Sequence, residues 1–228
     1  MAVKVYFTKH GNYARYNVSP PGPPPDGFEY VKSIAANWGN FAAYGFDTDI
    51  DAAVNWPNGH VYFFKGEKYA KYNIQQNKIT QDPHETKDYW DGFAGTGFDE
   101  YIDAALELGD GSAWFFRDDE CLLFGEEKGT ETVVVGPGKI STLLPDLASA
   151  SFGSGAEGNF GSHLDDGVFM SGKGYLFKGE HYIRVTRSGD FLLVDADYPL
   201  KTKDQWVGFP PTFTAKNFQS IWIDPNHT

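Results

Sequence analysis

The fold is decided by one stretch, Val61-Tyr62-Phe63-Phe64-Lys65-Gly66-Glu67-Lys68-Tyr69-Ala70-Lys71-Tyr72-Asn73, because the chain contains it more than once. A gapless copy near the N-terminus is Val5-Tyr6-Phe7-Thr8-Lys9-His10-Gly11-Asn12-Tyr13-Ala14-Arg15-Tyr16-Asn17. Two weaker copies are Ala113-Trp114-Phe115-Phe116-Arg117-Asp118-Asp119-Glu120-Cys121 and Gly174-Tyr175-Leu176-Phe177-Lys178-Gly179-Glu180-His181-Tyr182. Their starts, at 5, 61, 113 and 174, give a period of about 57 residues, which indicates a repeat architecture.

Each copy alternates aromatic and polar residues on either side of a Lys-Gly-Glu type of turn, and this pattern predicts a pair of antiparallel strands. Three copies are preceded by a short strand of small residues, at 50–54, 102–106 and 164–168. Three are followed by a terminator that begins with Trp38, Trp90 or Trp206, and Leu144-Pro145-Asp146-Leu147 replaces it in the third repeat. A unit with one narrow inner strand and wider aromatic outer strands is typical of a propeller blade.

The first copy has no small-residue strand before it, but Phe218-Gln219-Ser220-Ile221-Trp222-Ile223 near the C-terminus has the right length to supply it. We therefore predict an all-β, four-bladed propeller in which this strand completes blade 1 and leaves no open sheet edge. The expected blades are 1–41 with 218–223, then 50–93, 102–147 and 164–209. A β-sandwich of short hairpins would explain the alternation, but neither the period nor the missing first strand.

The Asp-Ala-Ala strand at 51–53, the strand pair at 61–73 and the Trp-x-Gly-Phe terminator at 90–93 resemble hemopexin repeats. As a single four-repeat unit, the chain is most similar to the albumin-2 seed proteins and related hemopexin-fold lectins. This resemblance implies a binding protein in a storage or defence role, an ion in the axial channel, and polyamines among the possible ligands. Repeats of this kind serve many functions, so the resemblance predicts the fold more firmly than the ligand.

Composition narrows the classes of partner. The 228 residues carry 19 Lys and Arg against 31 Asp and Glu, a net charge of −12, and 17% of them are aromatic. Such aromatic content excludes a disordered chain, and the acidic surface disfavours nucleic acid and membranes. The N-terminus shows no secretory signal peptide, so we expect a cytoplasmic or intracellular storage location. Cys121 stands alone in a strand, which excludes an internal disulfide and predicts a buried, inert thiol.

One position of the four inner strands carries oxygen-bearing side chains, Asp51, Asp103, Asp165 and Gln219. In a closed ring these residues bring carbonyl oxygens and up to three carboxylates towards the axis, and hard cations prefer oxygen ligands. We predict calcium, or another hard cation such as sodium or magnesium, in the central channel. Alternatively, each Asp caps a loop. Two residues further on, a second ring is expected from Ala53, Ala105, Gly167 and Ile221.

The small-molecule ligand is expected to be a carbohydrate, with a polyamine as the alternative. Trp56 lies between Asn55 and Asn58 in a constrained Pro-Asn-Gly turn, where an aromatic face and amides suit a sugar. Packing against the next blade is the other interpretation of Trp56. Asp166, beside Asp165 near the axis, is the best candidate carboxylate for a spermine-type polyamine.

Haem and catalysis are both disfavoured. None of the six histidines belongs to a paired ligand motif, and His163, at the expected channel mouth, is the best single candidate for haem. The sequence has no nucleophile elbow, no His-Glu-x-x-His and no Cys/His metal cluster, so we predict a non-enzymatic protein. A protein-docking module is the third functional alternative, and a homodimer is left open. The segment Ser19–Pro25 predicts a stiff, exposed loop rather than a polyproline ligand.

Overall fold

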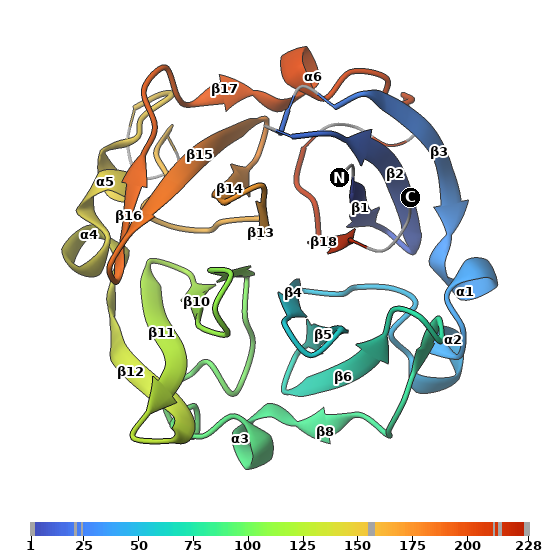
Figure 1. Cartoon of the computed structure of the whole chain (residues 1–228), viewed down its shortest axis with the longest axis horizontal. Coiled ribbons are helices and arrows are strands. Elements are labelled where there is room, and N and C mark those ends of the chain that lie inside the picture. Colours follow the sequence, from blue (N-terminus) through green and yellow to red (C-terminus); the bar gives the residue numbers. More distant parts are fainter. Residues whose placement is uncertain are drawn as a thin grey trace.

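The computed structural model describes residues 3–225 except 21, 24, 155–157, 212, 214 and 215. Four antiparallel sheets surround a central axis, each running from an inner strand to the rim (Figure 1). This arrangement confirms the predicted four-bladed propeller. No helix among the described residues has the length and apolar character needed to span a bilayer.

Each blade orders its strands from the axis outwards. Blade 1 contains β18 (Ser220–Asp224), β1 (Val3–Lys9), β2 (Asn12–Val18) and β3 (Gly27–Ser33). Blade 2 contains β4 (Ala52–Trp56), β5 (His60–Lys65), β6 (Lys68–Asn73), β7 (Lys78–Ile79) and β8 (His84–Glu85). Blade 3 contains β9 (Ala104–Glu107), β10 (Ala113–Arg117), β11 (Glu120–Glu127) and β12 (Thr130–Lys139). Blade 4 contains β13 (Asp166–Met170), β14 (Lys173–Lys178), β15 (His181–Ser188), β16 (Phe191–Val194) and β17 (Leu200–Lys201).

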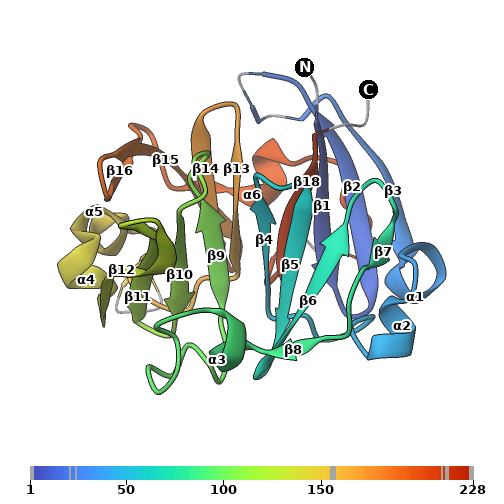
Figure 2. The same cartoon turned by 60° about the horizontal axis from the view of Figure 1, so that its bottom comes forward.

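The C-terminal strand closes the ring as expected. β18 pairs antiparallel with β1, from Lys4 opposite Asp224 to Thr8 opposite Ser220, and the two strands lie side by side in both views (Figures 1 and 2). The rings of Tyr6 and Trp222 stack across this pair with centroids 4.1 Å apart. Stacked aromatic pairs of this kind stabilise the closure beyond the strand hydrogen bonds.

Short helices, which the sequence analysis did not anticipate, follow the outer strands at the rim. They are α1 (Ile34–Asn37), α2 (Phe41–Tyr44), α3 (Thr86–Tyr89), α4 (Ile140–Leu143), α5 (Pro145–Ser149) and α6 (Thr202–Gln205). The terminator residues Trp38, Trp90 and Trp206 come directly after α1, α3 and α6. Each of these tryptophans is buried, so the terminators pack their rings between blades.

The core consists of one hydrophobic cluster between each pair of neighbouring blades. Aromatic rings dominate the interfaces between blades 1 and 2, 2 and 3, and 4 and 1, whereas aliphatic side chains dominate the interface between blades 3 and 4. Cys121 is buried in this aliphatic cluster, and burial raises the pKa of its thiol to about 12. A thiol with so high a pKa is protonated at neutral pH and is a poor nucleophile.

Candidate functional site: the axis and the blade interfaces

The four residues predicted to surround the axis each cap the β-turn of their own blade. In each blade a side-chain oxygen accepts a hydrogen bond from a backbone N–H of the turn. Asp51 accepts from Gly66 at 2.6 Å and Asp103 from Asp118 at 2.6 Å. Asp165 accepts from Gly179 at 2.9 Å and Gln219 from His10 at 2.6 Å. Burial raises the pKa of all three carboxyls, that of Asp165 to about 7. These side chains therefore cap turns, as the alternative interpretation expected. The inner strands begin one residue after these four positions, not before them.

The predicted second ring is a ring of backbone amides around one carboxylate. Asp166 is completely buried, and its carboxylate accepts N–H bonds from Ala53 at 3.2 Å, Ala105 at 3.0 Å and Ile221 at 2.6 Å. The amide of Gly167 is a further donor to it. Equivalent amides of all four blades thus converge on a single side chain. Asp166 connects the blades at the axis, and no sugar or polyamine can reach its carboxylate without opening the ring.

Asn55, two residues after Ala53 in β4, likewise connects two blades near the axis. Its Nδ2 donates to the Ile223 carbonyl and its Oδ1 accepts the Ile223 N–H, both at 2.8 Å, so its amide bridges β4 and β18. A cavity of about 60 Å³ lies here, lined by residues that include Glu107 and Phe169. Asn58 bonds to the Tyr62 hydroxyl and to the His60 N–H within its own hairpin. The two amides predicted to flank a sugar thus both have partners within the chain.

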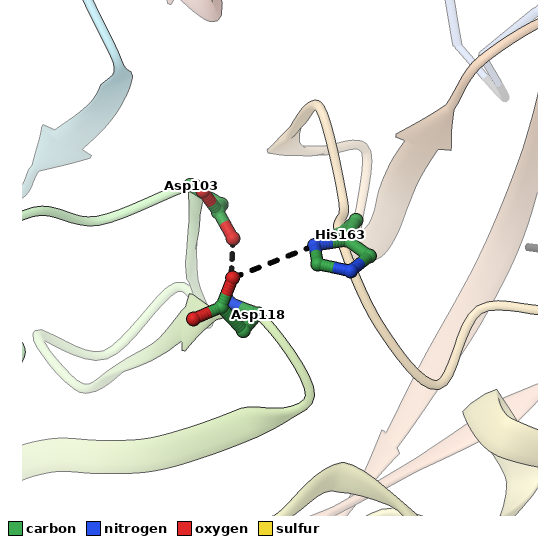
Figure 3. Close-up of side chains that lie close together, drawn as sticks. All are labelled: Asp103, Asp118 and His163. Carbon is green, nitrogen blue, oxygen red and sulfur yellow. Dashed lines mark hydrogen bonds and ion pairs between the residues drawn. The ribbon is translucent and has the colours of Figure 1, made fainter. Parts of the chain in front are cut away.

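A second group of possible cation ligands lies between blades 3 and 4, where Asp103, Asp118 and His163 bring ligand atoms within 4.8 Å of one another (Figure 3). His163 Nδ1 lies 3.5 Å from Asp118 Oδ1, and its imidazole is about half exposed. The Tyr101 hydroxyl donates to Asp118 Oδ2 at 2.5 Å. Two carboxylates and an imidazole suit a divalent cation, and His163 faces these carboxylates rather than standing alone.

Trp56 lies in the wall of a pocket of about 280 Å³ between blades 2 and 3. Its ring packs edge-on against Trp90 at 5.6 Å and lies 6.2 Å from Phe124, so it also covers the neighbouring blade. The other lining side chains are Tyr62, Tyr69, Lys71, Gln81, Tyr89 and Glu131. Tyr89 is 60% exposed at the edge of the pocket. Aromatic walls with a few polar groups at the edge are typical of a small-ligand site.

A comparable pocket of about 260 Å³ lies between blades 1 and 2. Its aromatic lining is Tyr6, Tyr13, Trp38, Tyr72 and Trp222, and its polar lining is Arg15, Asn37, Gln75, Asn77 and Asp224. The buried indole N–H of Trp222 has no hydrogen-bond partner among the residues that the structure describes.

Comparison with known proteins places the chain in a family. The model of the hemopexin family matches residues 50–94, which form blade 2. Albumin-2 of Pisum sativum is 31% identical over 195 residues, a match that covers 82% of this chain and 76% of that protein. The chain belongs to the albumin-2 family of hemopexin-like proteins. The hemopexin model matches blade 2 alone, and the other three blades complete the ring of this albumin-2 homologue.

Solved structures of similar shape support the fold of this albumin-2 homologue. A plant lectin with two metal binding sites from Cicer arietinum has a TM-score of 0.75 at 21% identity, covering 89% of this chain and 90% of that one. A plant albumin from Cicer arietinum showing hemagglutination also has a TM-score of 0.75, at 20% identity, covering 89% and 90%. The similar proteins named here are albumins and a lectin.

Sequence reasoning found one wall of the pocket in this albumin-2 homologue but missed most of its lining. Lys71, Gln81 and Trp90 reach Trp56 through the folding of blade 2 itself, and the packing of blade 3 adds Phe124 and Glu131. Aligning the repeats could have indicated part of this lining, because the tyrosines of the strand pair recur at fixed positions. The loop at Ser19–Pro25 is also less exposed than expected, since Gly22 and Pro25 are buried; Pro21 and Pro24 lie outside the described residues.

Proposed function

We propose that the protein is a non-enzymatic, lectin-like albumin that binds a carbohydrate in the pocket around Trp56. The observation that carries the proposal is the combination, in one pocket, of aromatic side chains with Lys71, Gln81 and Glu131. The flat C–H face of a pyranose packs on aromatic rings, while an ammonium, an amide and a carboxylate hydrogen-bond to its hydroxyls. The polar partners differ from the amides of Asn55 and Asn58, which the fold uses internally.

The pocket is also preorganised for binding. Trp56 is held by Trp90, Phe124 and the edge of Tyr62, at centroid distances of 5.6, 6.2 and 6.1 Å. A wall held in this way loses little conformational entropy when a ligand binds, so more of the contact energy remains as affinity. Two relatives of similar fold support the proposal, one named a lectin and the other described as showing hemagglutination.

The test begins with a glycan array and continues with calorimetry on the strongest ligand. Trp56→Ala should weaken affinity by about 30-fold, roughly 2 kcal/mol, as for an aromatic residue central to a site. Phe191→Ala is the matched control, because Phe191 is a 56% exposed aromatic residue outside the pocket. Glycan binding that survives Trp56→Ala at full strength would show that Trp56 only covers blade 3.

A cation in the axial channel is the second part of the proposal. The side chains of Asp51, Asp103, Asp165 and Gln219 cap turns, so we assign the ligand role to their backbone carbonyls, which suit a hard cation such as calcium. The buried carboxylate of Asp166 would balance part of its charge. The group of Asp103, Asp118 and His163 is the alternative location.

Elemental analysis and thermal melting with Ca²⁺ or a chelator test the cation. Calcium at 100 times its dissociation constant should stabilise the protein by about 2.7 kcal/mol. Asp118→Asn leaves every axial carbonyl in place and should keep this shift. If Asp118→Asn abolishes the shift, the cation lies between blades 3 and 4; if the wild-type protein holds no metal and does not respond, there is no cation site.

The alternative ligand is a spermine-type polyamine, favoured by the net charge of −12. Glu131 in the Trp56 pocket would bind an ammonium group, and the tyrosine faces would support it through cation–π contacts. Calorimetry with spermine separates this alternative from the carbohydrate, because Glu131→Gln should reduce spermine affinity far more than sugar affinity.

A further inference from the structure

The pocket between blades 1 and 2 repeats the pocket between blades 2 and 3. When the repeats are aligned on their strand pairs, equivalent residues line both, namely Tyr6 and Tyr62, Tyr13 and Tyr69, and Trp38 and Trp90. The neighbouring blade contributes Tyr72 to one pocket and Phe124 to the other, again from the same repeat position. The two pockets are therefore copies of one structural site.

The charged groups follow the same equivalence. Arg15 in the first pocket corresponds to Lys71 in the second. The Arg15 guanidinium carbon lies 6.0 Å from the Tyr6 ring centroid, and the Lys71 ammonium lies 5.9 Å from that of Tyr62. Both pockets thus place a cation about 6 Å from the equivalent tyrosine, but Arg15 is also paired with Glu29 and lies 4.4 Å from the Tyr30 centroid.

The interface between blades 3 and 4 does not retain this pocket. The repeat positions that line the pockets carry Leu108, Trp114, Cys121, Leu123, Leu144 and Val185, all buried in a single cluster. The Trp114 indole N–H donates to the Asp190 carbonyl at 3.1 Å, in the turn between β15 and β16. Aliphatic side chains thus replace the aromatic wall, and the hollow of about 300 Å³ that remains at this interface, beside Leu123, Arg187 and Asp190, has no aromatic lining among the described residues.

The interface between blades 4 and 1 retains the aromatic residues but is covered. Tyr175, Tyr182 and Trp206 occupy the pocket positions and are buried, as their equivalents Tyr6, Tyr13 and Trp38 are. A Cβ on Gly22, in the loop between β2 and β3, would lie 2.2 Å from the Tyr175 hydroxyl, so the backbone of this loop rests on the tyrosine. The backbone at Gly22 thus covers Tyr175, and the pocket at this interface, of about 360 Å³, lies instead beside Trp206 and Phe209.

We propose that the pocket between blades 1 and 2 is a second binding site for the same class of ligand, a pyranose sugar, so that one chain is bivalent. The inference rests on the proposed carbohydrate function, but it concerns a different pocket. Asp224 stands in the second site where Trp56 stands in the first. Without that ring, less of the sugar face is covered, and the second site should bind the same sugar more weakly.

The tryptophans provide a separate signal for each site. Trp56 and Trp90 line one pocket, Trp38 and Trp222 line the other, and Trp114 lines neither. Protein labelled with 5-fluorotryptophan gives a ¹⁹F resonance for each, assigned by Trp→Phe variants. Methyl glycosides of glucose, galactose, mannose and N-acetylglucosamine are then titrated, first into the wild-type protein and then into Trp56→Ala.

One glycoside should shift both tryptophan pairs with two different affinities and leave Trp114 unmoved. Trp56→Ala should weaken binding seen at Trp90 by at least 10-fold and change binding seen at Trp38 and Trp222 by less than 2-fold. Shifts at Trp56 and Trp90 alone overturn the second site and leave the proposed function intact. Shifts at Trp38 and Trp222 alone overturn bivalency and move the single site, and no shift with any glycoside overturns both proposals.

Discussion

At the centre of the propeller the four blades make equivalent contacts, whereas at the rim the four interfaces between blades are of two kinds. At the centre, equivalent backbone amides of every blade point to one carboxylate, that of Asp166. At the rim, the aromatic pocket is kept at two interfaces, whereas at the other two its positions are filled or covered by the chain itself and the remaining hollows have a different lining. Backbones crowd together at the axis, so geometry restricts the inner residues. The rim has room for the repeats to diverge, and the proposed binding sites lie there.

The largest effect is expected at the centre. Asp166→Ala leaves four buried amides without their acceptor, and each unsatisfied group costs about 1–3 kcal/mol, so the free energy of unfolding should fall by about 4 kcal/mol or more. Chemical denaturation measures it. Formate, which restores a carboxylate to the ring, should recover part of the loss.

The matched control at the centre is Asp51→Ala. That change removes only the cap on the Gly66 amide and should cost about 1 kcal/mol, as a lost capping residue does. Equal losses in the two variants would show that Asp166 does not join the blades, and that the centre is held by strand packing alone.

The next prediction compares a filled interface with an open one. Trp114 is 1% exposed within the aliphatic cluster, and Trp114→Ala should cost about 3–5 kcal/mol through the cavity it leaves. Trp56 is only partly buried, so Trp56→Ala should cost about 1–2 kcal/mol. Thermal or denaturant unfolding of both variants gives the comparison. Similar costs would mean that Trp56 is as structural as Trp114, and that its interface is not open.

The difference between the centre and the rim also explains how much of the fold and of the site the sequence could predict. The period, the missing first strand and the C-terminal segment at 218–223 predict the ring, because repetition at the axis is strict. The direction of the Asp51 side chain was not predictable, since an Asp before a strand either turns inwards or caps a turn, and the turn amide of Gly66 decides it. The pocket linings required the contact between blades, which no single repeat contains.

A smaller effect should come from the loop that covers the fourth interface. Gly22 has a φ of +121° and no room for a Cβ beside Tyr175, so Gly22→Ala should destabilise the fold by about 1–3 kcal/mol through backbone strain and displacement of the loop. Gly129→Ala is the control, because Gly129 also has a positive φ but meets no atom within 4 Å. If the two variants unfold alike, the loop does not rest on blade 4.

The smallest expected effect is that of salt on ligand binding at the open interfaces, and its size distinguishes the two ligand classes. A neutral sugar bound through aromatic faces and hydroxyl hydrogen bonds has no net charge to screen, so its affinity should change by less than about twofold between 50 and 500 mM salt, although the Debye length shortens severalfold. A polyamine drawn by a net charge of −12 should lose affinity steeply over the same range. Calorimetry at three salt concentrations, on the wild-type protein and on Trp56→Ala, separates the contribution of the pocket from that of the whole acidic surface. A steep loss for the sugar itself would mean that the charges of Lys71 and Glu131, rather than the aromatic walls, dominate binding in the pocket.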